Sequence, residues 1–283
     1  SPIKYHWGHL DQGFAQAATV LERTYTDRRV WTREDTMFQV TTWIDDGQLK
    51  VKVPTQWPFH VRDTVASICA RTKKSVTVYP MAHFSTKDEK ILQPSILAAI
   101  AALATVKSNS PVMLSSRFPT YKSPIIIMRK TALDAQGKPI AEEVDAQIDQ
   151  GAFPLFTGEL FKQVLAGLIP LYPLEAFSAQ VRIVESHSPP SHFFGDLGYS
   201  SALFSSEAHA SAIARQLQVN PSNWRMKHYG ETKERAKILE TPPVPRLRDL
   251  IGTTCTVSDF ARHCAAYELQ RREIGRASCR ERV

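Results

Sequence analysis

Alternating apolar and polar residues predict β-strands along much of the chain. The pattern is clearest in residues 37–44 and 48–53, which flank Asp46-Gly47, a pair suited to a two-residue hairpin turn. Further strands are predicted at residues 76–79, 111–116, 123–133, 140–149 and 179–186. Residues 11–26 are predicted to form a short helix that runs into a strand.

Apolar residues at helical spacing predict helices between these strands. Pro58 can occupy the first position of a helix over residues 58–71, and Asn220 followed by Pro221 has the sequence of a helix N-cap. Other helices are predicted over residues 94–106, 158–169 and 200–219. The fold class that follows is α/β in the broad sense, a mixed α+β protein of mixed sheets with packed helices.

The composition is that of a globular protein, with 283 residues of which 43% are hydrophobic. The net charge of +7 could favour nucleic acid, but basic residues are spread along the chain among acidic ones. The densest basic runs, residues 71–75 and 231–237, are interpreted as solvated faces. Because no nucleic-acid-binding motif accompanies them, no nucleic-acid partner is expected.

Four cysteines show neither metal-ligand nor disulfide-framework spacing, which favours a reducing, cytoplasmic setting. They are Cys69, Cys255, Cys264 and Cys279. The longest apolar run, residues 95–106, is too short to cross a bilayer and is interpreted as a buried helix. No membrane partner is therefore expected.

Both ends of the chain suggest a fragment. The sequence begins at Ser1 without an initiator methionine, so an upstream part is expected to be missing. Residues 273–283 have no apolar periodicity and resemble the in-frame translation of a sequencing adapter. We therefore leave that segment out of the fold prediction.

Common catalytic motifs are missing from the sequence: it has no glycine-rich dinucleotide loop, phosphate-binding loop, H-E-x-x-H or G-x-S-x-G. Two histidine pairs, His6 with His9 and His187 with His192, have no third ligand on a defined helix and are interpreted as surface or packing residues. Two acidic pairs, Asp45-Asp46 and Glu142-Glu143, are assigned to a turn and to an exposed strand edge, where solvation explains them.

Six phrases in order carry a resemblance to a known family. They are "GHLDQGFAQAATVLERTY", "WIDDGQLKVKVPTQWPFHVR", "SVTVYPMAHFSTK", "IDQGAF", "HFFGDLGYSSALFSSEAHASAIARQL" and "NPSNWRMKHYGE". The chain resembles the molybdopterin-binding large subunit of the xanthine dehydrogenase and aldehyde oxidase family, in a divergent and truncated form. The resemblance implies a molybdenum–molybdopterin cofactor and hydroxylation of an N-heterocycle or an aldehyde with oxygen from water. It also implies iron–sulfur and FAD partners, and it leaves a homo-oligomer open.

The resemblance also divides the chain into segments. Residues 1–8 correspond to the end of an upstream linker, and residues 9–231 to a first molybdopterin-binding domain. Residues 232–272 correspond to the start of a second, truncated domain, followed by the adapter-like residues 273–283. The catalytic base of the family lies further downstream, so no catalytic residue is predicted here.

The family's T-Q-x-P phrase is intact as residues 55–58, and its glutamine hydrogen-bonds the oxo ligand of molybdenum. Gln56 is therefore the first predicted cofactor residue. The alternative reading is a solvent-exposed glutamine at a strand-to-helix turn shaped by Pro58.

The family's glycine-rich cofactor loop aligns with residues 81–87, which contain no glycine. Glycine serves in such loops because backbone can then approach a ligand closely. By alignment, Phe84 and Ser85 are predicted cofactor residues, with His83 and Ser85 where glycines would stand. Asp88 aligns with a substrate-facing glutamate, although a solvated turn also explains it.

This chain also departs from a second family phrase, R-G-x-G-x-x-Q, by the loss of a polar side chain. Here Phe194 replaces the arginine, Gly195 and Gly198 remain, and Ser201 stands near the glutamine. The alignment makes Gly195 a predicted cofactor residue and Phe194 a predicted substrate residue. Glu207 retains the family's helix carboxylate, with a structural role expected.

Two hypotheses remain open. The chain is either part of a divergent molybdenum hydroxylase whose cofactor is held by a rebuilt loop, or a cofactor-poor relative that acts as a binding or scaffold subunit. The missing glycines and the missing arginine favour the second hypothesis. The retained Gln56 favours the first.

Overall fold

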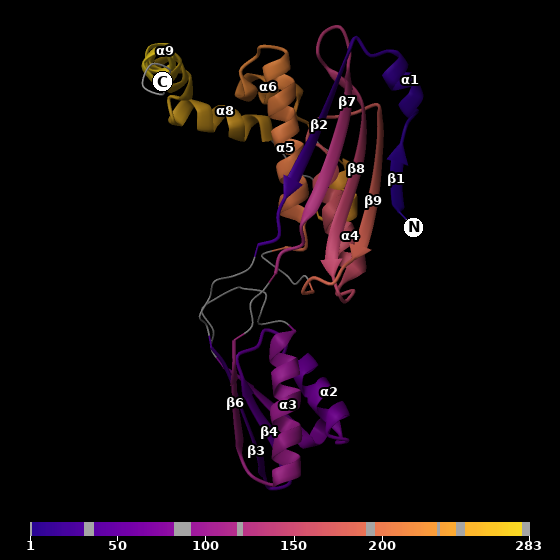
Figure 1. Cartoon of the computed structure of the whole chain (residues 1–283), viewed down its shortest axis with the longest axis vertical. Helices are drawn as coiled ribbons and strands as arrows, with labels where there is room; N and C mark the ends of the chain where they lie inside the picture. The colour runs from indigo at the N-terminus through magenta and orange to yellow at the C-terminus, as the bar shows by residue number, and fades with distance from the viewer. Residues whose placement is uncertain are drawn as a thin grey trace.

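The computed structural model describes residues 2–30, 37–81, 92–117, 121–190, 196–230, 233–241 and 247–278. Two β-sheets, each with helices packed on it, form most of the described chain (Figure 1). We call residues 37–81 and 92–117 the small lobe and the remaining described residues the large lobe. The predicted mixed α+β class is confirmed.

The small lobe is a four-stranded sheet in the order β5-β4-β3-β6, with two helices on one face (Figure 1). Its strands are β3 (Phe38–Asp45), β4 (Gln48–Val53), β5 (Val76–Pro80) and β6 (Val112–Ser116). Its helices are α2 (Pro58–Ile68), the short 3₁₀ helix η1 (Lys73–Ser75) and α3 (Gln93–Ser108). β3 pairs antiparallel with β4 and β6, whereas β4 pairs parallel with β5.

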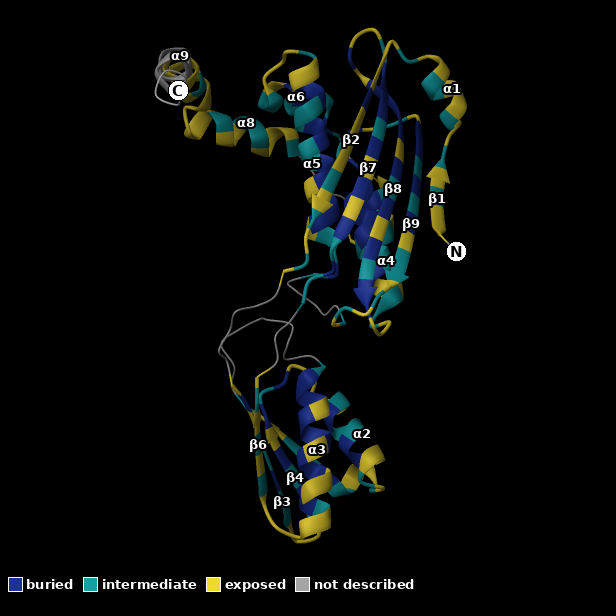
Figure 2. Cartoon of the chain, viewed as in Figure 1, coloured by how far each residue is buried: buried dark blue, intermediate teal, exposed yellow. Residues whose placement is uncertain are grey.

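Local sequence explains the start of this sheet. Asp46 (φ 48°) and Gly47 (φ 73°) both adopt left-handed backbone, as the predicted two-residue turn between β3 and β4 requires. The alternating residues Leu49, Val51 and Val53 of β4 are fully buried beneath the two helices. Figure 2 shows dark blue, buried stretches along α3, which packs on this sheet.

The large lobe is a five-stranded sheet in the order β1-β9-β8-β7-β2. Its strands are β1 (Ile3–Trp7), β2 (Thr19–Asp27), β7 (Ile125–Leu133), β8 (Pro139–Gly151) and β9 (Ala176–Glu185). Its helices are α1 (Leu10–Ala15), α4 (Thr157–Leu168), α5 (Tyr199–Gln216), α6 (Pro221–His228), α7 (Lys233–Leu239), α8 (Leu247–Val257) and α9 (Phe260–Ser278). β8 and β9 pair parallel, and α4 connects them.

Several predicted elements of the large lobe are confirmed. Strands β7, β8 and β9 and helices α4 and α5 lie where the pattern predicts them. The Asn220 side chain accepts a hydrogen bond from the backbone N–H of Ser222 (2.9 Å), so the predicted N-cap of α6 is confirmed. Strand β1 and helices α7 to α9 were not predicted from the pattern.

A buried ion pair joins β7 to β8. Arg129 and Glu142 are both fully buried, and the Arg129 guanidinium donates to one Glu142 oxygen from Nε (2.9 Å) and Nη2 (2.5 Å). Tyr172 donates its hydroxyl to the other Glu142 oxygen (2.6 Å), and Arg129 also donates to Ser205 (3.0 Å) and to the Leu168 carbonyl (2.6 Å). The exposed strand edge expected for Glu142 was therefore wrong, because every Glu142 oxygen has a buried donor.

Replacing Arg129 with methionine should destabilise the large lobe by about 3–5 kcal/mol, because Glu142 keeps its charge without a partner. Urea denaturation of Arg129→Met measures this loss. The matched control is Arg182→Met, which removes an ion pair between β9 and β8 whose side chains are 45% and 27% exposed. That control should cost about 0–1 kcal/mol.

The double variant Arg129→Met/Glu142→Leu removes both charges and should recover much of the loss. Equal losses in the free energy of unfolding for Arg129→Met and Arg182→Met would show that the buried ion pair stabilises the fold no more than the exposed one.

Candidate functional site

The carboxyl ends of β4 and β5 lie side by side at one edge of the small lobe. Val53 pairs with Pro80, and the Met81 N–H donates to the Val53 carbonyl (2.9 Å). Because β4 and β5 are parallel, α2 returns the chain to the starting edge, and α2 and α3 both begin at the carboxyl edge. In open sheets with parallel strands, such an edge is where ligands bind.

The Thr55–Pro58 segment lies at this edge. Thr55 is 2% exposed, and its Oγ1 accepts a hydrogen bond from the Trp57 N–H (2.9 Å), which turns the threonine inward. Gln56 is exposed and has no hydrogen-bond partner among the described residues. Its amide group, with two donors and one acceptor, is therefore available to a ligand.

Three side chains fix the helices around Gln56. The Trp57 ring stacks on His60 with centroids 4.8 Å apart. His60 Nδ1 lies 2.7 Å from the Oγ of Ser95, which is 1% exposed in the first turn of α3. The first turns of α2 and α3 are thus tied together. This contact could not be predicted from sequence patterns, because His60 and Ser95 are far apart in the chain.

The large lobe repeats the same arrangement. Strand β8 ends at Gly151, α4 follows, and β9 returns parallel to β8, so the carboxyl ends of β8 and β9 also share an edge. In Figure 1 these ends lie toward the small lobe. The rings of Trp57 and Phe156, which immediately precede α2 and α4, have centroids 6.4 Å apart. The edges of the two sheets that hold the carboxyl ends of the parallel strands are therefore in contact where α2 and α4 begin.

Asp149 and Gly151 shape the edge of the large lobe. Gly151 has φ +82°, and a Cβ there would lie 2.3 Å from the Pro189 carbonyl oxygen, so only glycine fits. Asp149 accepts hydrogen bonds from the Gly151 N–H (2.8 Å), Ser186 (2.8 Å) and Arg29 (3.1 Å). Burial raises the pKa of Asp149, but these hydrogen bonds and the Arg29 charge outweigh it and hold the pKa below 3.8.

The edge of the small lobe suits a polar group with negative charge. Neither α2 nor α3 has an acidic residue in its first turn, so within these helices no carboxylate offsets the positive ends of the two helix dipoles. Exposed Gln56 lies immediately before one of these helices. A molybdopterin, which carries a phosphate and several polar ring groups, fits these described residues.

The other five predicted site residues all lie outside the described part of the chain. These are Phe84, Ser85, Asp88, Phe194 and Gly195. Their predicted roles remain predictions.

Two neighbours in the second family phrase have structural contacts. Gly198 (φ 87°) is the N-cap of α5. Ser201 is 2% exposed and donates to Asp27 (2.7 Å). The Ser201 hydroxyl is therefore occupied by the protein itself.

Glu207 also has protein partners. It accepts hydrogen bonds from Arg225 Nε (3.1 Å) and from the Tyr229 hydroxyl (2.7 Å). This agrees with the structural role expected for it, since the carboxylate ties α5 to α6 and to the residue that follows it.

The charged run at residues 231–237 was interpreted as a solvated face, and this was wrong for Arg235. Arg235 is 7% exposed and donates to the Ile169 carbonyl, so α7 contacts the end of α4 through it. Within the described ranges, no three histidine, cysteine, aspartate or glutamate side chains are grouped to hold a metal ion. Among those same residues, no helix is long and apolar enough to cross a membrane.

Comparison with known proteins gives one family. The family model described as "Molybdopterin cofactor-binding domain" matches residues 2–229. Probable hypoxanthine oxidase XdhD of Escherichia coli K12 is 24% identical over 77% of this chain and 23% of that protein. Aldehyde oxidase 4 of Cavia porcellus is 20% identical over 87% of this chain and 19% of that protein. The chain thus spans about a quarter or less of the length of these relatives.

Solved structures share the fold. A carbon monoxide dehydrogenase from Oligotropha carboxidovorans matches 97% of this chain and 36% of its own, with a TM-score of 0.79 and 16% identity. A quinoline 2-oxidoreductase from Pseudomonas putida 86 matches 95% of this chain and 36% of its own, with a TM-score of 0.79 and 19% identity. The arrangement of both lobes is therefore one that known proteins adopt.

Buried His209 should make stability depend on pH. Burial lowers the pKa of His209 from 6.5 to about 4, and the ring contacts Thr131 (2.9 Å) and Tyr25 (3.0 Å). The unfolded chain takes up a proton near pH 6.5, whereas the folded chain takes it up only near pH 4. The contribution of neutral His209 to the free energy of unfolding is therefore fully present above pH 6.5. It is lost progressively as the pH falls from 6.5 to about 4.

Urea midpoints measured across this range check the prediction. His209→Gln should flatten the pH dependence, whereas His187→Gln at an exposed position should leave it unchanged. An unchanged slope in His209→Gln would assign the pH dependence to other groups.

Proposed function

The chain belongs to the molybdopterin cofactor-binding domain family, and we propose that it forms one wall of the cofactor site of a molybdenum hydroxylase. The reaction proposed for the whole protein is hydroxylation of an N-heterocycle or an aldehyde with oxygen from water. The relatives described as hypoxanthine oxidase and aldehyde oxidase support this reaction class. Iron–sulfur and FAD subunits or domains are the proposed electron acceptors.

One observation carries this proposal: Gln56 is exposed, without a partner among the described residues, at the edge where α2 and α3 begin. The bound cofactor would supply two-electron redox chemistry at molybdenum. Gln56 would donate its amide N–H to the cofactor, and the first N–H groups of α2 and α3 would face negative charge. Trp57, His60 and Ser95 hold that edge rigid through their stacking and hydrogen bond.

A cytoplasmic location is part of the same proposal. The cysteines that the structure describes, Cys69, Cys255 and Cys264, are all free thiols. Free thiols suit a reducing compartment.

A second candidate function is a scaffold subunit with little or no cofactor. The chain has no glycine between Gly47 and Gly137, so the segment after β5 lacks the residue type that lets backbone approach a ligand closely. In this role the fold would be retained for contact with partner subunits.

Molybdenum and pterin content distinguishes the two candidates. The full-length protein, expressed with its partner subunits, should contain close to one molybdenum and one pterin per chain. Gln56→Ala should lower the affinity for the cofactor or the activity by about 10–100-fold, because a group that orients the metal centre is lost.

The matched control is Gln39→Ala, an exposed glutamine of β3 in the same lobe, which should behave as the unmodified protein. A folded, metal-free complex would support the scaffold role and overturn the hydroxylase proposal. Equal metal content and equal activity in Gln56→Ala and Gln39→Ala would remove Gln56 from the site.

A further inference from the structure

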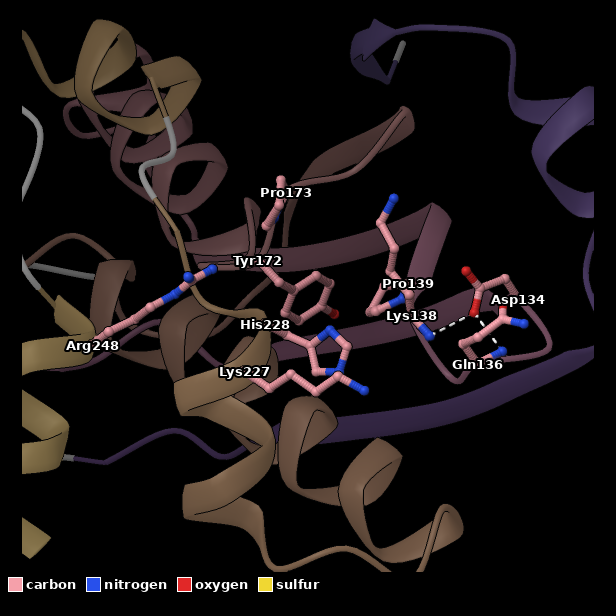
Figure 3. A pocket seen from close by; sticks show the side chains of 9 residues that line it. All are labelled: Asp134, Gln136, Lys138, Pro139, Tyr172, Pro173, Lys227, His228 and Arg248. Carbon is pink, nitrogen blue, oxygen red and sulfur yellow. Dashed lines mark hydrogen bonds between the residues drawn. The ribbon is translucent and has the colours of Figure 1, made fainter.

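A cavity of about 440 Å³ lies in the large lobe, at the end of β8 opposite to Gly151 (Figure 3). The turn between β7 and β8, the end of α6 and the start of α8 surround it. Its lining residues are Asp134, Gln136, Lys138, Pro139, Tyr172, Pro173, Lys227, His228 and Arg248. The volume is in the range of small-molecule sites.

Positive charge dominates the lining. The lining holds three cations, Lys138, Lys227 and Arg248, and one carboxylate, Asp134, which accepts from the backbone N–H groups of Gln136 (2.9 Å) and Lys138 (2.8 Å). Arg248 donates its Nε to the Tyr229 carbonyl, and among the described residues its two terminal nitrogens have no hydrogen-bond partner.

The two lysines are also available to a ligand. Lys227 is exposed and has no acidic partner within the part of the chain that the structure describes. Lys138 has only a long contact with Glu175 (3.3 Å), in which both side chains are at least half exposed. Such a pair contributes little energy, so it competes weakly with a bound anion.

The pKa of His228 reflects the excess of positive charge around the cavity. Burial lowers the pKa of His228 most, and the positive charges of Lys227, Arg248 and Lys138 lower it further, with only Asp134 opposing them. The three cations therefore outnumber the one carboxylate that acts on His228. A bound anion would reverse this effect and raise the pKa of His228.

The floor of the cavity is rigid. Tyr172 is 1% exposed, and its hydroxyl is held by the buried carboxylate of Glu142 (2.6 Å). The imidazole of His228 packs on Trp224 with ring centroids 4.8 Å apart. Figure 3 shows the Tyr172 ring at the centre, with Arg248 and Lys138 on opposite sides and Lys227 and His228 below. The cationic residues that line the cavity thus come from three separate segments.

We propose that this cavity binds a small molecule that carries a phosphate group, separately from the cofactor edge. A tetrahedral phosphate offers oxygens in several directions, which matches donors that come from a turn and two helices. A planar carboxylate presents its two oxygens in one plane and would engage fewer of them. The aromatic and proline walls leave room for an apolar part of the ligand.

Inorganic pyrophosphate is the probe, titrated into the full chain by calorimetry and by NMR of the histidine rings. Binding should weaken as salt rises, and the pKa of His228 should rise on binding. Lys227→Ala should weaken binding about tenfold, as expected for one lost charged hydrogen bond. Lys74→Ala removes the same charge from an exposed site in the small lobe and should have no effect.

Equal weakening by Lys227→Ala and Lys74→Ala would show a non-specific charge effect and overturn the proposal. An absence of pyrophosphate binding, or an unchanged pKa of His228 at saturation, would overturn it as well. Gln56→Ala should leave pyrophosphate binding intact, so the outcome is independent of the hydroxylase proposal.

Discussion

Parallel strand pairing is the constraint on which the rest of this structure depends. Parallel neighbours cannot be joined by a tight hairpin, so β4 and β5 need α2 between them, and β8 and β9 need α4. Each crossover brings two carboxyl ends and a helix N-terminus to one edge. The contact between Trp57 and Phe156 joins the two edges, so the backbone topology brings the Gln56 segment to the large lobe.

The buried polar core of the large lobe connects to its cavity. Arg129 neutralises Glu142, and Glu142 in turn holds the hydroxyl of Tyr172. The ring of Tyr172 forms the floor of the basic cavity. An ion pair that stabilises the sheet therefore also fixes a surface that faces the ligand space, although no residue of the pair lines it.

Much of the fold could be predicted from local sequence, because the deciding interactions are local. Asp46-Gly47 and Asn220-Pro221 each determine a turn or a cap within a few residues. Strand β1 escaped prediction because it has only five residues and pairs as an edge strand with the distant β9, although Ile3, Tyr5 and Trp7 alternate with polar residues. Helices α8 and α9 have no fully buried side chain among their described residues, and in α8 only the partly buried Leu247 and Ile251 pack against a core cluster, which is a weak signal in the sequence.

The sites depend on distant contacts, which sequence patterns do not show. Gln56 was proposed because a contiguous phrase surrounds it, and the structure shows that it is exposed, while its role as a cofactor residue stays a prediction. From the sequence alone Glu142 is interpreted as a solvated acid, because its partners Arg129 and Tyr172 are distant in the chain. The basic cavity combines residues from 134 to 248, with no motif in between.

The central claim, that the exposed Gln56 faces the molybdenum cofactor, is tested most directly by X-ray diffraction from crystals of the full-length complex at the molybdenum absorption edge. The account predicts one anomalous peak beside the Gln56 side chain, at the edge where α2 and α3 begin. A molybdenum peak away from this edge, or a well-ordered complex with no such peak, would contradict it.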